Sequence, residues 1–188
     1  MDDYDYALPE GRIARYPAPV RDESRLLVVH QGSRPNEHAR FHEVARLFAP
    51  GDVLVVNESR VLPARLLGRK PTGAPSEVLL IRPVVERGQH GSSSAGAHDD
   101  AKLWEALVRP GGKLKPGRRV VISDELTVEI VDSTEGGGRV VRLDTPLSTA
   151  AALERYGHVP LPPYLERDDE PLDRERYQTV YARLPGSR

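Results

Sequence analysis

Short apolar runs separated by turn residues fill the middle of the chain, from about residue 61 to residue 143. The runs are rich in the β-branched and aromatic residues that strands favour, and the segments between them contain Gly, Pro, Asp and Ser. Leu126, Val128 and Ile130 alternate with polar residues, a pattern typical of a strand with one face in water. Five or six such runs without a helix between them predict a small antiparallel β-barrel or sandwich.

The segment before these strands mixes strand and helix patterns. Residues 24–29 predict a buried strand, and apolar residues at helical spacing within 41–48 predict a helix. Residues 52–56 form a second apolar run, after which the chain turns polar at Asn57. The strand that follows contains Pro63, which lacks an N–H group, so we expect that strand to lie at a sheet edge or to carry a bulge.

After residue 143 the pattern becomes helical. A helix is predicted over 146–157, with Ser148 or Thr149 as its N-cap and Gly157 as its end. Three prolines then favour an extended path, and residues 173–183 predict a second short helix. We therefore predict a mixed α/β fold with an inserted antiparallel β-barrel. Its parts are residues 1–60 in the α/β domain, 61–146 in the barrel with a flexible Gly/Ser-rich hairpin loop at 86–100, and 147–188 back in the α/β domain.

Composition narrows the class of protein. The 188 residues contain no Cys, which excludes disulfides, thiolate zinc sites and a Cys nucleophile. The acidic first residues are unlike a signal peptide, and no apolar run approaches the ~18 residues of a membrane span. We expect a cytoplasmic protein that does not enter a membrane.

The net charge of −1 conceals an asymmetry along the chain. Residues 51–119 carry twelve Lys and Arg against seven Asp and Glu, whereas residues 120–188 carry eight against thirteen. A polyanion partner is attracted to such a basic region because its phosphates release counterions on binding. A solvated surface laced with salt bridges gives the same counts, and charge alone favours that interpretation.

Signatures of common catalytic sites are absent from the sequence. There is no phosphate-binding Gly-Lys-Ser/Thr loop, no dinucleotide-binding GxGxxG, no GxSxG and no HExxH. His38 and His42 have the i, i+4 spacing of metal ligands, but no carboxylate accompanies them at a strong spacing. We expect no metal site.

A basic segment at 104–119 is a candidate contact for RNA. Two groups of Gly and Pro predict a loop that projects from the barrel, and only Glu105 opposes its positive charges. Trp104 lies within a strand and is interpreted as a core residue instead of a base-stacking one. The predicted tRNA-binding residues are Arg109, Lys113, Lys115, Arg118 and Arg119.

A second polar constellation begins at Asn57. Asn57 and Arg60 lie where an apolar strand suddenly turns polar, a common place for a site, and Arg65 follows on the next strand. Their guanidinium groups suit phosphate or carboxylate, although exposed positions of an edge hairpin give the same pattern. Arg69 and Lys70 are interpreted as such exposed strand positions.

The last segment combines carboxylates and tyrosines. Three adjacent acidic residues, 168–170, are interpreted as solvated. Tyr177, Gln178 and Tyr181 are expected on the short helix, where packing is the favoured role of Tyr181.

These segments together resemble one family, the S-adenosylmethionine:tRNA ribosyltransferase-isomerases of queuosine biosynthesis. The similar segments occur in the family's order and cover nearly all of the chain outside the Gly/Ser-rich loop. The most specific are "NESRVLPARLLGRK" and "PPYLER" followed by "RYQTVYA". "KPTGAPSEVLL" departs from the family pattern of paired Gly, so a close backbone approach to ligand is in doubt at Ala74 and Pro75. In the family a further segment and a second α/β half follow, so the resemblance implies an N-terminal half with an incomplete α/β domain.

The resemblance also implies a reaction and its participants. The ribosyl part of S-adenosylmethionine is moved onto 7-aminomethyl-7-deazaguanine in tRNA, giving epoxyqueuosine, adenine and methionine, without a metal. The implied partners are the precursor-bearing tRNA, S-adenosylmethionine as co-substrate and the missing C-terminal half. His158 is a candidate base because imidazole titrates near neutral pH. The expected site residues are His158, Tyr177 and Gln178 for catalysis and Asn57, Arg60, Arg65 and Arg167 for substrate binding.

Two alternatives of another kind stay open. A non-catalytic RNA-binding β-barrel module would use the basic region as a phosphate footprint, and an inert remnant would bind nothing. Affinity for tRNA that falls steeply with salt distinguishes the first from the second.

Overall fold

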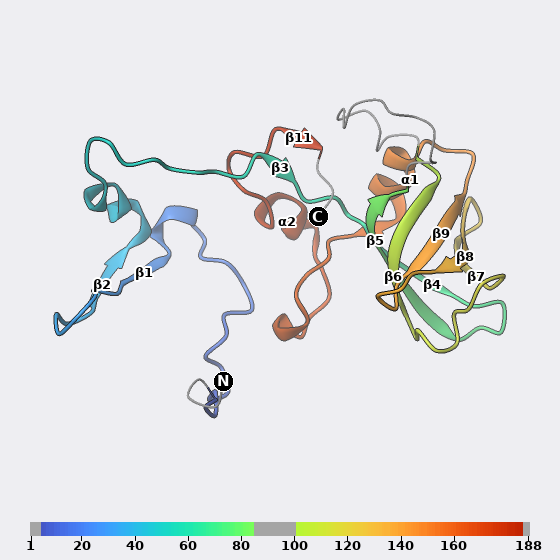
Figure 1. The fold of residues 1–188 in the computed structure, drawn as a ribbon, viewed down its shortest axis with the longest axis horizontal. Coiled ribbons are helices and arrows are strands. Elements are labelled where there is room, and N and C mark those ends of the chain that lie inside the picture. Colours follow the sequence, from blue (N-terminus) through green and yellow to red (C-terminus); the bar gives the residue numbers. More distant parts are fainter. Residues whose placement is uncertain (1–4, 85–100, 186–188) are drawn as a thin grey trace. The chain divides into compact units, whose positions relative to one another are not determined.

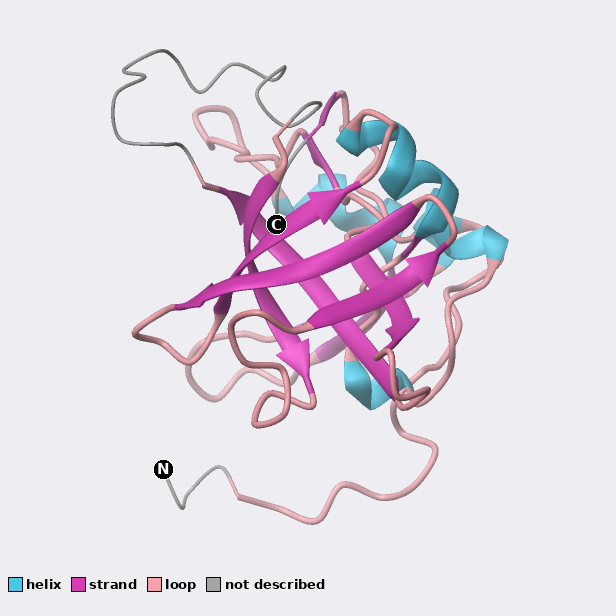
Figure 2. Ribbon diagram, turned by 90° about the vertical axis from the view of Figure 1, so that its right-hand side faces the viewer, coloured by secondary structure: helices cyan, strands magenta, loops and turns pink. Residues whose placement is uncertain are grey.

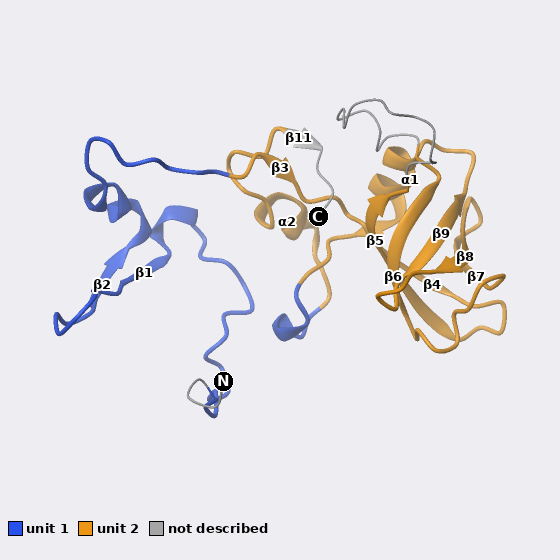
Figure 3. Ribbon diagram, viewed as in Figure 1, with its two compact units in different colours: residues 1–56, 162–167 blue, residues 57–161, 168–188 orange. Residues whose placement is uncertain are grey.

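The computed structural model describes residues 5–84 and 101–185 (Figure 1). The predicted loop at 86–100 lies outside the described residues. The chain divides into two compact units, residues 1–56 with 162–167 (unit 1) and residues 57–161 with 168–188 (unit 2) (Figure 3). The elements of unit 1 are 3-10 helices at Arg21–Glu23, Phe41–Leu47 and Pro163–Leu165 and the strands β1 (Arg25–Val28) and β2 (Glu37–Arg40).

Unit 2 contains the other strands and both α-helices. The strands are β3 (Ser59–Arg60), β4 (Arg65–Arg69), β5 (Pro75–Pro83), β6 (Leu103–Arg109), β7 (Arg119–Ser123), β8 (Leu126–Ser133), β9 (Arg139–Asp144), β10 (Gly157–His158) and β11 (Leu184–Pro185). The α-helices are α1 (Thr149–Tyr156) and α2 (Pro171–Arg176).

Six of these strands form a closed antiparallel barrel (Figure 2). Their order is β4-β5-β6-β9-β8-β7, and pairing of Arg69 with Val121 closes β7 back onto β4. The predicted β-barrel is therefore confirmed. The assignment of 1–60 and 147–188 to one interrupted α/β domain stays a prediction.

Alternating side chains of the barrel strands fill its interior. Leu126, Val128 and Ile130 are buried as their alternation predicts, and Trp104 is a core residue whose indole Nε1 donates to the carbonyl of Ala101 at 2.8 Å. Burial of this apolar surface stabilises the barrel by about 25 cal/mol per Å². The barrel core also includes side chains of α1, so the helix packs against the barrel.

The predicted helix α1 begins and ends where the sequence indicates. The Ser148 Oγ accepts a hydrogen bond from the Ala151 amide at 3.2 Å, which makes Ser148 the N-cap. Gly157 ends the helix with an extended backbone, and a Cβ there would lie 1.9 Å from the carbonyl oxygen of Pro63. Glycine is therefore required at this position for a close approach of two backbones.

Unit 1 corrects the first predicted strand and helix. β1 pairs with β2, but its side chains alternate between exposed and partly buried, so the strand is not buried as expected. The apolar residues of 41–48 form a 3-10 helix without a buried residue. Two strands and a short helix bury little of their apolar surface, which explains both differences.

The run 52–56, which is apolar after Asp52, belongs to no helix or strand in the described structure. Val53 and Val55 are 86% and 88% exposed. The predicted strand is therefore wrong for this chain, because apolar and β-branched residues favour extension but a ladder needs a second strand. Pro63 precedes β4 instead of interrupting it.

The last predicted helix is shorter than expected. α2 ends at Arg176, so Tyr177, Gln178 and Tyr181 lie in the turn that follows and not on a helix. Beyond this turn, β11 pairs in parallel with β3. Among residues 5–84 and 101–185, no helix is long and apolar enough to cross a membrane.

Candidate functional site

His158 and Asp169 form a hydrogen-bonded pair beside the barrel. The Nδ1 of His158 lies 2.8 Å from Oδ1 of Asp169, and the Val159 amide donates to Oδ2 at 3.0 Å. The Asp169 side chain is only 10% exposed, whereas that of His158 is 42% exposed. Because the carboxylate accepts, Nδ1 carries the proton and the lone pair of neutral His158 is on Nε2.

The strand pairing places this pair next to Arg65. In the β10–β4 ladder His158 stands opposite Arg65, whose guanidinium contacts the Glu77 carboxylate at 2.9 and 3.2 Å. The hydrogen bond to Glu77 raises the pKa of Arg65 above its ordinary value, burial opposes this, and the charges of Glu77, Asp169 and Asp168 add to the rise. The structure thus brings two predicted residues, His158 and Arg65, into one charged cluster.

The other predicted catalytic residues have different surroundings. The Gln178 amide donates to the Val61 carbonyl at 2.9 Å and accepts from the Val61 amide at 2.8 Å. Tyr177 caps α2 and its side chain is partly exposed. Gln178 therefore ties the turn after α2 to the segment between β3 and β4, through the same hydrogen-bond pattern that a neighbouring strand would use.

Asn57 and Arg60 lie in the first residues of unit 2, and both are exposed. The Asn57 side chain accepts from the Ser59 amide at 2.8 Å, a turn-forming interaction, and Arg60 lies on β3. Arg167 belongs to unit 1, where its Nε donates to the Arg15 carbonyl at 2.8 Å and its guanidinium lies 4.4 Å from the centre of the Tyr16 ring. The predicted substrate-binding residues therefore belong to two separate units.

A basic groove lies on the barrel between the β4–β5 turn and the β6–β7 loop. Its volume is about 550 Å³, and no carboxylate lines it. We call it the basic groove and define it by Lys70, Pro71, Thr72, Gly112, Lys113, Lys115, Gly117, Arg118 and Arg119. Four of the five predicted tRNA-binding residues are therefore gathered in one place, together with Lys70.

Several contacts hold the β6–β7 loop in place. Leu114, in the middle of the loop, is fully buried in the barrel core. Arg139 of β9 donates to the carbonyl oxygens of Leu114 at 2.8 Å and Gly111 at 2.9 Å. The Gly117 amide donates to the Ile130 carbonyl at 2.8 Å, so the loop is tied to β8 as well. The cations of this loop thus project from a backbone anchored at three points.

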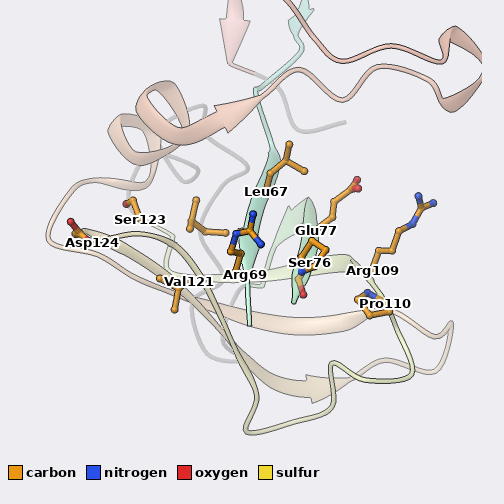
Figure 4. A pocket seen from close by; sticks show the side chains of 12 residues that line it. Leu67, Arg69, Ser76, Glu77, Arg109, Pro110, Val121, Ser123 and Asp124 are labelled. Atoms are coloured by element: carbon orange, nitrogen blue, oxygen red, sulfur yellow. The ribbon is translucent and has the colours of Figure 1, made fainter. Parts of the chain in front are cut away.

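A second groove, of about 860 Å³, crosses the seam where β7 meets β4 (Figure 4). Its lining includes Arg69, Glu77 and Arg109 together with apolar residues such as Leu67 and Val121. These side chains belong to β4, β5, β6 and β7 (Figure 4). Arg109, which the sequence groups with the basic loop, therefore lines this groove and not the basic one.

Comparison with known proteins places the chain in a family. Residues 1–188 match the family described as queuosine biosynthesis protein. The chain belongs to this family. A Symbiobacterium thermophilum protein named S-adenosylmethionine:tRNA ribosyltransferase-isomerase is 45% identical over 190 residues, which cover 100% of this chain and 50% of that protein. A Pelotomaculum thermopropionicum protein of the same name is 44% identical over 189 residues, again 100% of this chain and 50% of that protein.

This member of the queuosine biosynthesis family spans about half the length of the curated relatives that it matches. A crystal structure of S-adenosylmethionine tRNA ribosyltransferase from Thermotoga maritima is 34% identical and covers 83% of this chain and 48% of that one, with a TM-score of 0.38. The family resemblance derived from the sequence motifs is confirmed.

Three site residues of this family member escaped the sequence analysis. The sequence favours a solvated Asp169, but its side chain is only 10% exposed and contacts His158. The sequence contains no pattern that points to a role for Glu77. It favours an exposed strand position for Lys70. Antiparallel register decides the contact of Glu77: Arg65 pairs with Leu79 and Leu67 with Glu77, so Arg65 and Glu77 are diagonal neighbours across the β4–β5 hairpin.

Metal ligation finds no support in the described ranges. No group of three or more His, Asp or Glu side chains there is arranged to hold an ion. His38 lies on β2 and His42 in the following 3-10 helix. The expectation that the reaction needs no metal stays a prediction.

Proposed function

We propose that the chain carries part of the catalytic machinery of a tRNA ribosyltransferase-isomerase. The reaction moves the ribosyl part of S-adenosylmethionine onto 7-aminomethyl-7-deazaguanine in tRNA, yielding epoxyqueuosine, adenine and methionine. The observation that carries this proposal is the match of the whole chain to the family.

His158 acts as the general base. A sulfonium stabilises negative charge on the adjacent carbon, so a placed base is enough to remove a proton there. The unprotonated Nε2 of His158 accepts that proton, and the resulting imidazolium is stabilised by Asp169 through Nδ1. This arrangement of a base oriented by a buried carboxylate recurs in unrelated enzymes.

Arg65 and Gln178 support this site in different ways. Arg65 supplies positive charge beside His158, and Glu77 fixes its orientation. Gln178 holds the turn after α2 against Val61, and so positions Tyr177. Asn57, Arg60 and Arg167 are proposed to contact substrate.

Release of adenine by the purified chain tests the proposal. The chain is mixed with S-adenosylmethionine and precursor-bearing tRNA, and circular dichroism verifies that it is folded. Loss of a general base is expected to slow adenine release by about 10²- to 10⁴-fold. A decrease of this size in His158→Ala supports the assignment. Release that is unchanged in His158→Ala contradicts the role of His158.

Asp169→Asn separates a positioning role from a structural one. The amide can donate to Nδ1, which moves the imidazole proton to Nε2 and removes the lone pair from the exposed side. Nitrogen NMR of the ring therefore reports a change of tautomer even without substrate. An unchanged tautomer contradicts the positioning role of Asp169.

A non-catalytic RNA-binding module is the second candidate function. The basic groove favours it, because five cations line it and no carboxylate is among the lining residues, which suits a phosphate backbone. Binding of tRNA by a folded chain that releases no adenine supports this candidate over the first.

A further inference from the structure

The basic groove joins two segments about forty residues apart in the sequence. Lys70 and Thr72 come from the turn between β4 and β5, and the other cations come from the loop between β6 and β7 and from Arg119, the first residue of β7. We infer that this groove is a binding site for the sugar-phosphate backbone of RNA, with Lys70 as one of its contacts and Arg109 outside it. The inference rests on the proposed function only in taking tRNA as the RNA.

The charges of the groove are available to a ligand. Of the five cations that line the groove, only Arg119 has a carboxylate partner among the described residues, with its guanidinium 4.0 Å from Glu129. Glu129 also contacts Arg142 at 3.5 Å and is therefore shared between two cations. The remaining side chains can neutralise phosphates, which then release their counterions, without breaking an internal ion pair.

Both sides of the groove are preorganised. The β4–β5 turn is closed by the Lys70 amide on the Ala74 carbonyl at 2.9 Å and by the Gly73 amide on the Lys70 carbonyl at 2.8 Å. Gly73 has a φ of +83°, which a residue with a Cβ adopts with strain. With the opposite loop anchored by Leu114 and Arg139, binding orders side chains and leaves the backbone as it is.

The lining favours RNA over an acidic protein segment. Protein interfaces draw most of their affinity from aromatic and apolar anchors in buried pockets. The basic groove contains none of these beyond Pro71, whereas nucleic-acid interfaces are polar and strongly positive. Thr72 adds a hydroxyl that can donate to a phosphate oxygen, a common backbone contact.

Lys70→Gln and Arg109→Gln make a matched pair of variants. Each removes one positive charge, and neither side chain has an ion pair in the described structure. The 188-residue chain is titrated into fluorescently labelled tRNA over a range of salt concentrations. Lys70→Gln is expected to reduce the salt slope by about 0.7–0.9 and the affinity at about 0.1 M salt by roughly five- to eightfold. Arg109→Gln is expected to leave both unchanged, and Lys70→Arg to restore them.

Three results would overturn the inference. They are an affinity of Lys70→Gln equal to that of the parent chain, a loss in Arg109→Gln as large as in Lys70→Gln, and no tRNA binding by the folded chain. Tighter binding of an acidic peptide than of tRNA would likewise replace RNA by protein as the occupant.

Since backbone contacts do not read bases, the Lys70→Gln effect should be the same for precursor-bearing and unmodified tRNA. Binding without adenine release would contradict only the proposed catalysis.

Discussion

In the barrel, Leu66 of β4 is completely buried, whereas Leu54, in the apolar run of unit 1, is 62% exposed. Both residues lie in short runs of apolar residues, and the sequence pattern predicts a strand for each run. The barrel strands find partners within the chain and close on themselves, while residues 52–56 belong to no helix or strand in the described structure. The pattern of a run therefore predicts extension, and closure of a sheet decides whether its apolar side chains are buried.

The largest expected difference between the two regions is in stability. Leu66→Ala removes a fully buried side chain and is expected to lower the free energy of unfolding by about 2–5 kcal/mol. Leu54→Ala makes the same chemical change at an exposed position and is expected to change it by less than about 0.5 kcal/mol. Urea unfolding monitored by circular dichroism compares the two, and equal losses would contradict the contrast.

The junction between α1 and the barrel gives the next largest effect. Gly157→Ala places a Cβ 1.9 Å from the Pro63 carbonyl oxygen and 2.5 Å from that of Leu153, so the backbone must move. We expect the free energy of unfolding to fall by about 3 kcal/mol, which is the upper end of the range for overpacked core positions. Gly136→Ala is the control, because a Cβ there meets nothing within 4 Å. Similar melting temperatures for the two variants would show that the junction is not tightly packed.

Much of the barrel is predictable from the sequence, and the cluster around His158 is not. The strands, the Ser148 cap and the burial of Trp104 follow from local patterns. The position of Asp169 depends on how the chain returns after its prolines to place a carboxylate beside β10, which no local pattern encodes. Arg69 and Lys70 are neighbours of the same charge but line different grooves, because Arg69 ends β4 and Lys70 begins the turn that follows.

A smaller effect is expected from the residue that anchors the basic loop. Arg139→Lys keeps the charge but removes the planar guanidinium group that donates to several carbonyls. We expect the free energy of unfolding to fall by about 1–2 kcal/mol. Amide exchange in residues 111–118 should become faster, and tRNA affinity should fall although the net charge is unchanged. Arg142→Lys, on the exposed face of the same strand, is the control. Unchanged exchange in Arg139→Lys would show that the loop is held by Leu114 and β8 alone.

The smallest expected effect concerns an exposed ion-pair group in unit 1. The hydrogen bond from His30 lowers the pKa of Glu37 below its ordinary value of 4.5, and Arg34 and Arg46 add to this. Ionised Glu37 therefore stabilises unit 1 above about pH 4.5, and this contribution is lost as the pH falls through the folded-state pKa. Carbon NMR of the Glu37 carboxyl measures the value. A Glu37 pKa at or above 4.5 would show that the interaction between His30 and Glu37 does not stabilise unit 1.

Amide hydrogen exchange of the whole chain, with and without tRNA, tests the contrast between the regions most directly. The closed barrel predicts slow exchange in the interior strands β4, β5, β6, β8 and β9 and fast exchange in residues 52–56. Addition of tRNA should slow exchange in residues 70–73 and 111–119. Equal protection of 52–56 and the barrel, or tRNA protection that avoids both sides of the basic groove, would contradict the account.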